Sequence, residues 1–496
     1  MNVKAITKEF GVKTSILIVC VLLSRLIAMY FIPLNDSTEA RYAEIARLML
    51  TSHDWISLMH YPGEYFWAKP PLSTWLSAIS MYILGVNPFA ARFPAWLMSL
   101  GCLALVAKVA YFQLGKSAAY WSVAVLSTCI YFLVDAGTVM TDPALLFCVA
   151  LVMVSFWMAM HTHQKHWAYL VFIGWGLALL VKGLVAGIFT VLPMFAWLIL
   201  TKNWHQAWQR LPWIKGSVLT IAIALPWYLL AEYKTPGFLS YFFIGEHFMR
   251  YLKPGWTGDL YGFAHKAPLG MIWVYFFIGI MPWSAVLLVW SCSKQAMFKI
   301  GSVDKSWHYY LLSFIVMPLT TFTFASNIIY PYVFPCLPAF ALWFALIAVK
   351  NGIDRRFKGF FNNVAVFMII ASLVTTGLFI KRPEHVSKSN NLIIDAWQND
   401  RQSDAEGLIY SMLQPEYSTM FYSSGLVKAT RDEVELCNYL RHGPQYVILN
   451  SDEPSQYDEF IENTYQKIFV QKHRNRFDTL YRVDSLPLFC KADYQD

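Results

Sequence analysis

Long apolar runs separated by short polar connections organise most of the chain. A helix that crosses the hydrocarbon core of a bilayer needs about 20 mostly apolar residues, and about eleven stretches come near this length. The pattern predicts a polytopic all-α membrane protein with about 11–13 transmembrane helices. The expected spans are residues 15–32, 88–112, 117–135, 142–160, 167–181, 184–201, 213–231, 269–291, 308–325, 328–349 and 359–380. A further apolar segment, 71–85, is short for a span and fits the membrane interface.

The pattern changes after residue 380. From there on, charges of both signs alternate with short strand-like runs at 445–449 and 467–470, which predicts a small soluble α/β domain. The expected organisation is a transmembrane domain, residues 1–380, with two wide polar loops, 33–87 and 232–268, and a C-terminal domain, 381–496.

Composition agrees with a membrane protein and excludes a soluble globular one. The chain is 57% hydrophobic and only 14% charged, and its aromatic residues reach 17%, which suits the membrane–water interface. The net charge of +8 raises the question of nucleic acid binding. The basic residues, however, fall in short clusters between apolar runs and not along one soluble face, so we expect membrane lipids and no nucleic acid among the partners.

The basic clusters predict the orientation of the spans, because Lys and Arg in short loops are retained on the cytoplasmic side. With the N-terminus inside, the cytoplasmic loops carry Lys116, Lys165, Lys202, Arg210, Lys215, Lys294, Lys299, Lys305, Lys350, Arg355, Arg356 and Lys358. Loops 33–87 and 232–268 and the C-terminal domain are then exported. Cys437 and Cys490 are the only cysteines of that domain, so they could form a disulfide if it is exported and should not if it is cytoplasmic.

The first exported loop holds dense charge just outside the membrane: Asp36, Glu39, Arg41 and Glu44. A solvated surface helix would explain these residues equally well. Lys69 argues for more, because Pro70 and Pro71 follow it and hold it at a rigid turn near the interface. A fixed cation at headgroup depth is suited to binding a lipid phosphate.

Other candidate residues face the same compartment. Asp142 opens the fourth span, where capping that helix is the alternative role, and Lys182 lies in a very short turn. Loop 232–268 contributes Arg250, Lys266 and two histidines, His247 and His265. The histidines could bind a divalent metal, but a lone histidine is more often simply hydrogen-bonded.

Seven motifs occur in order along the chain: Thr38-Glu-Ala-Arg-Tyr-Ala-Glu-Ile-Ala46, Lys69-Pro-Pro71, Thr141-Asp-Pro143, Leu180-Val-Lys-Gly183, Glu246-His-x-x-Arg250, His265-Lys-Ala-Pro268 and Tyr332-Val-Phe-Pro335. Together they resemble the ArnT family, the bacterial aminoarabinose transferases of lipid A, which are distantly related to protein O-mannosyltransferases. The resemblance implies a GT-C membrane fold, an undecaprenyl-phosphate-linked sugar donor such as aminoarabinose, and transfer to lipid A at the periplasmic face of the bacterial inner membrane. It implies no required cofactor and leaves a divalent metal open.

The resemblance also suggests roles for single residues. The acidic pair of the family corresponds to Thr38 and Glu39, and the family's arginine to Arg41. The phosphate-binding lysine corresponds to Lys69 and the second acid to Asp142. The loop histidine corresponds to His247, and the phosphate-contacting tyrosine to Tyr332. We therefore expect Asp36, Glu39 and Asp142 as catalytic residues, Arg41, Lys69, Lys182, Arg250, Lys266 and Tyr332 as substrate-binding residues, and His247 as a metal ligand.

Two departures from the family pattern affect the expected chemistry. Where the family has Asp-Glu, this chain has Thr38-Glu39 with Asp36 two residues earlier, so either carboxylate could act as the acid. Where aminoarabinose transferases have Glu-Lys-Pro, this chain has Ala68 before Lys69, which removes a carboxylate that could hold a metal or contact an amino sugar.

Three alternatives remain at this point. The acceptor could be a protein hydroxyl or another envelope glycan. A transporter or flippase for the lipid-linked sugar would also need many spans and an anion site, but it predicts charges near the membrane midplane. Most charges here gather on one exported face, which favours interfacial chemistry. A scaffold without activity would not explain Lys69 and the acidic motif.

Overall fold

A computed structural model of the protein describes residues 12–262, 265–291, 305–351, 354–402, 407–441, 445–452, 454–473 and 476–492. The expected cytoplasmic residues Lys294 and Lys299 lie outside these ranges, as do the side chains of Arg355, Arg356 and Lys358. By internal contacts the chain forms two compact units, one of residues 1–29 and 49–373 and the other of residues 30–48 and 374–496. The second unit resumes close to the boundary expected at residue 381 and also takes in part of the first polar loop.

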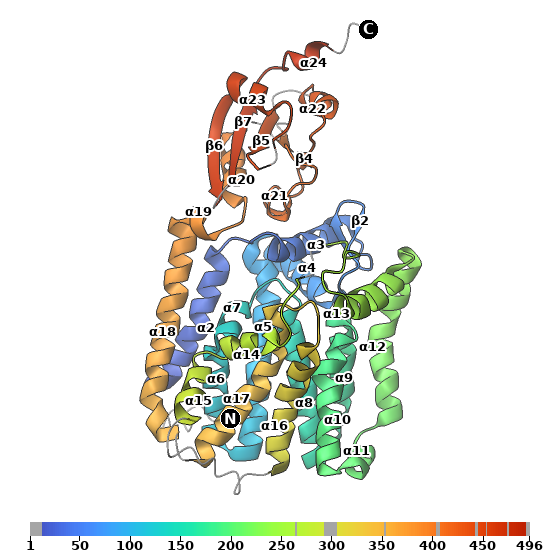
Figure 1. Ribbon diagram of the computed structural model, residues 1–496, viewed down its shortest axis with the longest axis vertical. Helices are drawn as coiled ribbons and strands as arrows, with labels where there is room; N and C mark the ends of the chain where they lie inside the picture. The colour runs from blue at the N-terminus through green and yellow to red at the C-terminus, as the bar shows by residue number, and fades with distance from the viewer. Residues whose placement is uncertain are drawn as a thin grey trace. The chain divides into compact units, whose positions relative to one another are not determined.

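Each of the expected membrane runs forms a helix or a pair of helices (Figure 1). They are α2 (Val12–Phe31), α5 (Pro88–Leu114), α6 (Lys116–Thr128) with α7 (Ile130–Asp135), α8 (Asp142–His161), α9 (Lys165–Lys182), α10 (Val185–Thr201), α12 (Trp213–Lys234), α14 (Met271–Gly279) with α15 (Trp283–Ser291), α16 (Lys305–Thr323), the 3₁₀ turn η3 (Tyr330–Cys336) with α17 (Leu337–Lys350), and α18 (Asp354–Lys381). The polytopic helical fold expected from the sequence is therefore confirmed.

Among the described residues, six helices are long and apolar enough to cross a membrane alone. They are Lys13–Phe31, Pro88–Leu114, Asp142–His161, Trp213–Lys234, Tyr330–Lys350 and Gly359–Lys381. The pair α14 and α15 passes the same test together but is bent by 99°. The other expected spans are shorter or interrupted helices, such as α6 and α7, which meet at Cys129. Segment 71–85 forms the short helix α4 (Leu72–Leu84), as its length suggested.

Helix α8 lies at the centre of the transmembrane unit. The share of its apolar window that is buried reaches 94%, against 28% for α12. Trp157 of α8 packs against Trp197 and Trp307 from two neighbouring helices, and large aromatic rings bury much apolar area. Helix α8 is thus surrounded by protein, whereas α12 leaves apolar side chains such as Ile214 and Leu229 exposed, as a lipid-facing helix does.

The connections of this unit contain a few short elements. They are β1 (Met59–Tyr61), β2 (Glu64–Tyr65), α11 (Trp204–Arg210), the π-helix η1 (Ser240–Met249) and α13 (Arg250–Leu252). Strands β1 and β2 pair antiparallel as a small hairpin just before Lys69. Helix α3 (Thr38–Ser52) begins in the second unit and ends in the first.

The second unit contains a five-stranded mixed sheet, in the order β4-β3-β5-β7-β6. Strand β3 pairs parallel with β4 and β5, and β7 pairs antiparallel with β5 and β6. The strands are β3 (Leu408–Tyr410), β4 (Val427–Ala429), β5 (Gln445–Asn450), β6 (Gln466–His473) and β7 (Arg476–Val483). The helices are α19 (Pro383–Val386), α20 (Asn391–Asp400), α21 (Tyr417–Tyr422), α22 (Glu433–Leu440), α23 (Asp458–Thr464) and α24 (Phe489–Ala492). The expected strands at 445–449 and 467–470 are β5 and part of β6, which confirms the small α/β domain.

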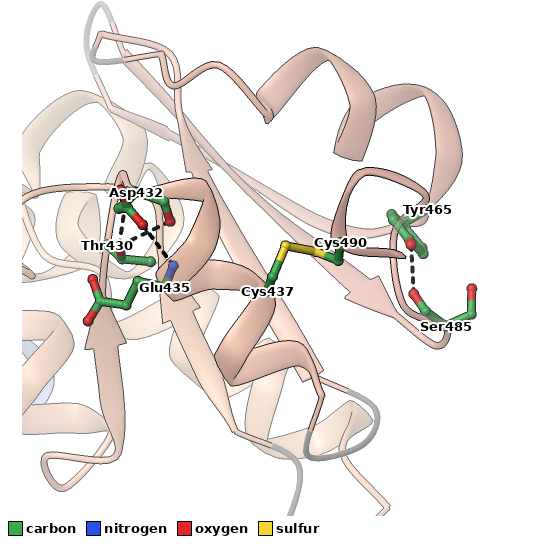
Figure 2. Close-up of a disulfide and its surroundings, with 7 residues drawn as sticks. All are labelled: Thr430, Asp432, Glu435, Cys437, Tyr465, Ser485 and Cys490. Carbon is green, nitrogen blue, oxygen red and sulfur yellow. Dashed lines mark hydrogen bonds between the residues drawn. A yellow bond between two sulfur atoms is a disulfide. The ribbon is translucent and has the colours of Figure 1, made fainter. Parts of the chain in front are cut away.

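A disulfide between Cys437 and Cys490 joins α22 to α24 (Figure 2). The two Cα atoms are 5.2 Å apart, and both cysteines are buried in the apolar cluster on one side of the sheet. Helix α22 begins where the Asp432 carboxylate accepts a hydrogen bond from the backbone N–H of Glu435, a normal N-cap. These two cysteines are the pair that the sequence suggested for an exported domain.

Candidate functional site

A cavity of about 410 Å³ in the transmembrane unit brings together several of the predicted site residues. Three cationic side chains line it: Lys69, Lys182 and Arg250. Its other polar lining residues are Glu246, His247, Tyr251, Thr321, Asn327 and Tyr332, and its apolar lining includes Leu184, Val185, Ile188, Phe242, Phe248, Leu252 and Phe322. A largely apolar space with clustered cations is suited to an amphiphilic anion.

The turn that presents Lys69 is held from both sides. Before it, the Tyr261 hydroxyl accepts a hydrogen bond from Trp67 N–H at 2.9 Å and donates one to Tyr65 O at 2.8 Å. After it, Pro71 is the N-cap of α4, so the helix fixes the end of the turn, as the two prolines predicted. Ala68 is buried. The ammonium of Lys69 is therefore placed by backbone that has little freedom to move.

The π-helix η1 supplies the carboxylate that Lys69 contacts. Lys69 Nζ lies 3.0 Å from Glu246 Oε2, and Arg250 donates to both oxygens of the same carboxylate at 3.2 and 3.0 Å. The Tyr241 hydroxyl donates to Glu246 Oε1 at 3.3 Å, and Asp259 is 3.5 Å from Arg250. Burial acts to raise the pKa of Glu246, but the charges of Lys69 and Arg250 outweigh it and hold that pKa below its ordinary value. Glu246 is thus an anion that bridges two cations.

His247, beside Glu246, is half-buried against the turn at Gly183. Its Nδ1 is 2.7 Å from Phe242 O, and Nε2 has no hydrogen-bond partner in the described structure. Gly183 makes this approach possible: its φ is +66°, and a Cβ there would lie 2.9 Å from His247 Nε2. Burial, aided by the charge of Lys69, lowers the pKa of the His247 imidazole, so the ring is neutral at neutral pH.

Within the described part of the chain, no group of three or more His, Cys, Asp or Glu side chains is arranged to hold a metal ion. The residue before Lys69 is Ala68, which offers no carboxylate beside His247. These residues do not fit a metal centre, and the metal role of His247 stays a prediction.

Lys182 and Asp142 form a second ion pair at the cavity. Lys182 Nζ is 2.6 Å from Asp142 Oδ1, and the side chains are only 9% and 5% exposed. Asp142 begins α8, but no side-chain cap hydrogen bond occurs at that end, so its carboxylate orients Lys182 instead. The Lys182 ammonium also lies 5.1 Å from the centroid of the Tyr332 ring.

The remaining predicted residues lie elsewhere. Lys266 is exposed, forms an isolated β-bridge with Asn327 and does not line the cavity. Asp36, Glu39 and Arg41 belong to the second compact unit.

Within that unit the Asp36 carboxyl group is constrained. Its Oδ1 accepts a hydrogen bond from Ser418 N–H at 3.0 Å, and its Oδ2 is shielded from solvent without a hydrogen-bond partner in the described structure. The residue as a whole is only half-buried, so the carboxyl group is more enclosed than the rest of the residue. Burial, together with the nearby charge of Glu416, raises the pKa of Asp36 to about 8. Glu39 is half-buried in the first turn of α3.

Two polar residues that organise the cavity, Glu246 and Asn327, were not among the predicted ones. Glu246 was visible only as part of the Glu-His-x-x-Arg motif, and its pairing with Lys69 spans 177 positions. Asn327 holds the loop after α13 by donating to Arg250 O at 2.6 Å and Lys253 O at 2.7 Å and by accepting from Gly255 N–H at 3.0 Å. A polar Ser-Asn pair between two apolar runs was the only sequence signal for it.

Known proteins resemble the chain over most of its length. A family model described as dolichyl-phosphate-mannose-protein mannosyltransferase matches residues 15–242. A protein of Enterobacter sp. (strain 638), named undecaprenyl phosphate-alpha-4-amino-4-deoxy-L-arabinose arabinosyl transferase, is 28% identical over 400 residues, which cover 76% of this chain and 68% of that protein. A protein of the same name from Edwardsiella ictaluri is 27% identical over 369 residues, which cover 70% of this chain and 64% of that protein. The matched parts thus span about two thirds of these relatives.

A solved structure extends the likeness to the whole fold. The crystal structure of ArnT from Cupriavidus metallidurans bound to undecaprenyl phosphate superposes with a TM-score of 0.74 and covers 95% of this chain and 98% of that one. The chain is thus similar in sequence to aminoarabinose transferases and in fold to ArnT. The resemblance expected from the motifs is therefore confirmed. At 17% sequence identity, the likeness between this chain and that ArnT-like structure concerns the fold.

Proposed function

We propose that this ArnT-like protein transfers a sugar, aminoarabinose or a related one, from undecaprenyl phosphate to lipid A. The observation that carries the proposal is the convergence of Lys69, Lys182 and Arg250 on one largely apolar cavity. A prenyl chain needs apolar walls and its phosphate needs fixed cations, and this cavity offers both. The names of the relatives from Enterobacter and Edwardsiella support the same donor.

Phosphate binding uses cations that are already in place. In the protein alone, Glu246 neutralises Lys69 and Arg250 and keeps them 3.0 Å from its own carboxylate. The donor phosphate takes over this role, with Tyr332 donating a further hydrogen bond. As the bond between the anomeric carbon and the phosphate oxygen breaks, its electron pair moves to that oxygen. Preorganised cations stabilise the developing charge without reorganising, which lowers the barrier.

The acceptor oxygen forms the new bond to the anomeric carbon. If the acceptor is a hydroxyl, a carboxylate must take its proton, whereas an acceptor phosphate is already anionic. The Asp36 carboxyl group is bound by Ser418 N–H and enclosed by protein, and burial raises its pKa and so favours its protonated form, so the proposal gives the catalytic part to Glu39. Asp142 orients Lys182 through their 2.6 Å contact. In this proposal Arg41 binds the substrate, and Lys266 binds phosphate groups of membrane lipids. No step is routed through a metal.

The chain is an integral membrane protein, and its orientation is part of the proposal. We place it in a bacterial inner membrane with the N-terminus in the cytoplasm and the site and C-terminal domain in the periplasm. Basic residues in alternate loops support this orientation, and so does the disulfide, because such bonds persist in oxidising compartments. A membrane-impermeant thiol reagent applied to cells with a permeabilised outer membrane should label Cys437 and Cys490 only after a reductant is added. Absence of labelling after reduction, with labelling once the inner membrane is opened, would contradict the export of this domain.

The decisive experiment compares lipid A from cells with and without the gene by intact mass spectrometry, with a Lys69→Ala complement. A sugar-sized mass increment that depends on the gene and is absent in the Lys69→Ala cells supports the proposal. Unchanged lipid A would reject lipid A as the acceptor.

A second acceptor has two observations in its favour. The family model that matches residues 15–242 is that of protein mannosyltransferases, whose name specifies a protein acceptor. Ala68 also removes the carboxylate expected beside the lysine of aminoarabinose transferases. A gene-dependent mass increment on exported proteins, with unchanged lipid A, would favour this function.

A further inference from the structure

The start of the acidic motif is bound by the C-terminal domain. Residues 34–47 belong to the same compact unit as residues 374–496. Leu34 N–H donates a hydrogen bond to the Tyr422 hydroxyl at 2.9 Å, and Lys388 N–H donates to Asn35 Oδ1 at 2.9 Å. Together with the bond from Ser418 to Asp36, these contacts fix three consecutive residues just before α3.

The other end of the motif is bound as well. The Arg41 guanidinium lies 5.8 Å from the centroid of the Tyr417 ring. Further along α3, Arg47 forms a buried two-point ion pair with Glu44 at 2.6 and 2.7 Å and donates to Ser424 O at 3.1 Å. Glu39 thus lies between two anchored stretches of backbone, and apart from Lys388 the anchoring residues belong to α21 or flank it.

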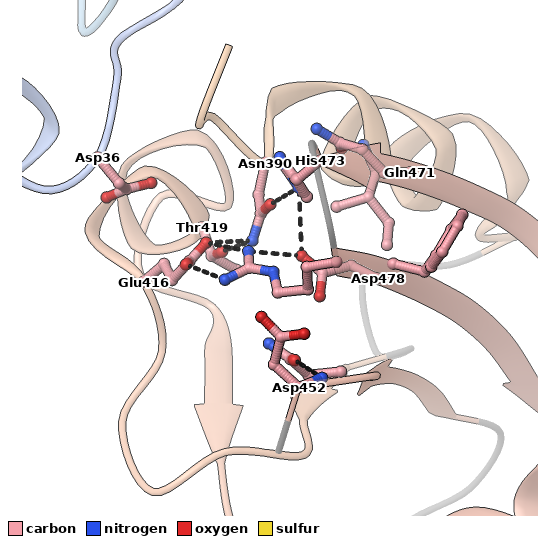
Figure 3. A network of polar contacts seen from close by, with 12 residues as sticks. Asp36, Asn390, Glu416, Thr419, Asp452, Gln471, His473 and Asp478 are labelled. Carbon is pink, nitrogen blue, oxygen red and sulfur yellow. Dashed lines mark hydrogen bonds and ion pairs between the residues drawn. The ribbon is translucent and has the colours of Figure 1, made fainter. Parts of the chain in front are cut away.

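A network of polar contacts within the C-terminal domain fixes the N-terminal end of helix α21 (Figure 3). Glu416, its N-cap, accepts hydrogen bonds from Arg476 at 2.7 and 2.9 Å, and Arg476 also contacts Asp478 at 2.8 Å. Asn390 donates to both Glu416 and Thr419 at 2.9 Å. A helix of six residues has little stability of its own, so these bonds determine where it lies.

Simple packing of a linker against a neighbouring domain would not need such contacts. Hydrogen bonds to successive residues define the position of a backbone in a way that apolar contact does not. Here hydrogen bonds at residues 34–36 and from Arg47 lie on both sides of the residues that carry the expected chemistry, Glu39 and Arg41.

We propose that the C-terminal domain positions Glu39 and Arg41 for sugar transfer, with α21 as the contact element and Tyr422 as a positioning residue. The inference rests on the proposed function, because it assigns the catalytic part to Glu39. It gives the exported domain, in which the sequence shows no catalytic motif, a defined role in the reaction.

The first test measures whether the backbone of residues 34–47 is held in place, and it does not depend on transfer activity. Hydrogen exchange of the full-length protein in detergent compares the wild type with Tyr422→Phe, which removes the hydrogen bond from Leu34 N–H, and with Asn35→Ala, which removes those from Lys388 N–H and the Ser387 hydroxyl. Tyr439→Phe is the matched control, because its hydroxyl bonds to Glu435 on the exposed side of α22 in the same domain. We expect faster exchange in peptides covering residues 34–47 for the two anchor variants only. Equal protection in all four proteins would overturn the inference.

The second test asks whether Tyr422 acts through Glu39. In a transfer assay, Tyr422→Phe should lower kcat about five-fold, the effect of one lost hydrogen bond, with an unchanged KM for the donor. In a Glu39→Gln background the same change should have no further effect, because its partner in catalysis is already gone. A general folding defect would instead lower kcat equally in both backgrounds and would reject the inference.

The two proposals fail in different ways. A wild type without any transfer activity rejects the proposed function, while the exchange experiment still reports whether the C-terminal domain holds residues 34–47. A wild type that transfers sugar and a Tyr422→Phe variant that transfers it equally well reject the positioning role alone.

Discussion

The two compact units each contain a carboxylate held by an arginine, but in different surroundings. In the transmembrane unit, Glu246 contacts Arg250 and also Lys69, and all three side chains line a cavity of about 410 Å³. In the C-terminal unit, Glu416 contacts Arg476 with two hydrogen bonds and receives a third from Asn390. The first ion pair faces a space that a ligand can enter, and the second is built into the support of α21.

The difference shows that similar ion pairs can serve ligand binding in one unit and structural support in the other. Around Glu246 two cations share one carboxylate, so a phosphate can replace that carboxylate and leave both charges satisfied. Around Glu416 the partners are fixed by the sheet and by Asn390, and removing one would leave a partly buried charge without its counterion. The Glu246 site is suited to exchanging its carboxylate for a ligand phosphate, whereas the Glu416 ion pair is suited to holding the fold in one arrangement.

The largest effect on transfer activity should come from removing one of the cations that line the cavity. Lys69→Ala should lower transfer by about 10²- to 10³-fold, the effect of losing one preorganised donor at a developing anion. Thermal unfolding in detergent should show that the variant remains folded. Lys234→Ala is the control, because Lys234 pairs with Asp54 at 2.9 Å and does not line the cavity. Full activity of Lys69→Ala would remove this lysine from the mechanism.

A smaller effect should separate the two carboxylates directly. Glu246→Gln and Glu416→Gln should each lower the free energy of unfolding by about 2 kcal/mol, because both leave a cation poorly paired. Undecaprenyl phosphate should restore the thermal stability of the Glu246→Gln protein, since a ligand that binds only the folded state stabilises it. It should not restore Glu416→Gln. Equal responses of the two variants to the lipid would show that the cavity does not exchange its anion.

The smallest effects concern pH and have opposite signs in the two units. The pKa of His247 is lowered by burial, so its contribution to stability is complete above the unfolded pKa of about 6.5 and is lost as pH falls through the folded value. The pKa of Asp36 is raised to about 8, so its contribution is complete below pH 3.8 and is lost as pH rises through 8.

Thermal unfolding from pH 4 to 9 measures both contributions. His247→Gln should flatten the acidic side of the stability curve and Asp36→Asn the alkaline side, because neither replacement titrates. Curves that run parallel to that of the wild type would show that these two groups do not set the pH dependence.

The sequence predicted what depends on local pattern. Apolar runs located the helices, and Pro70 and Pro71 located the turn that fixes Lys69, because both signals act within a few residues. The bend between α14 and α15 was missed, since the run 269–291 was read as one span although Pro282 lies at the break.

Pairings across long distances could not be predicted. Nothing near Glu246 indicates that it meets a lysine 177 positions away, because that contact depends on how helices pack. The same holds for Asp36, whose expected catalytic part rested on its place in a charged motif. Its hydrogen bond to Ser418 and its enclosed carboxyl group follow from the folding of a distant domain.

The separation between Asp36 and Ser418, 382 positions, has a consequence for the biogenesis of the protein. A ribosome adds about 5–20 residues per second, so the motif segment waits roughly 20 to 80 seconds after its synthesis before α21 exists. All residues that line the cavity, from Ala68 to Tyr332, are synthesised before α21, but until then the nascent chain lacks the partner proposed to order Glu39. On the proposed positioning role, chains that end before α21 should transfer sugar more slowly than the full-length protein even when their membrane helices are inserted.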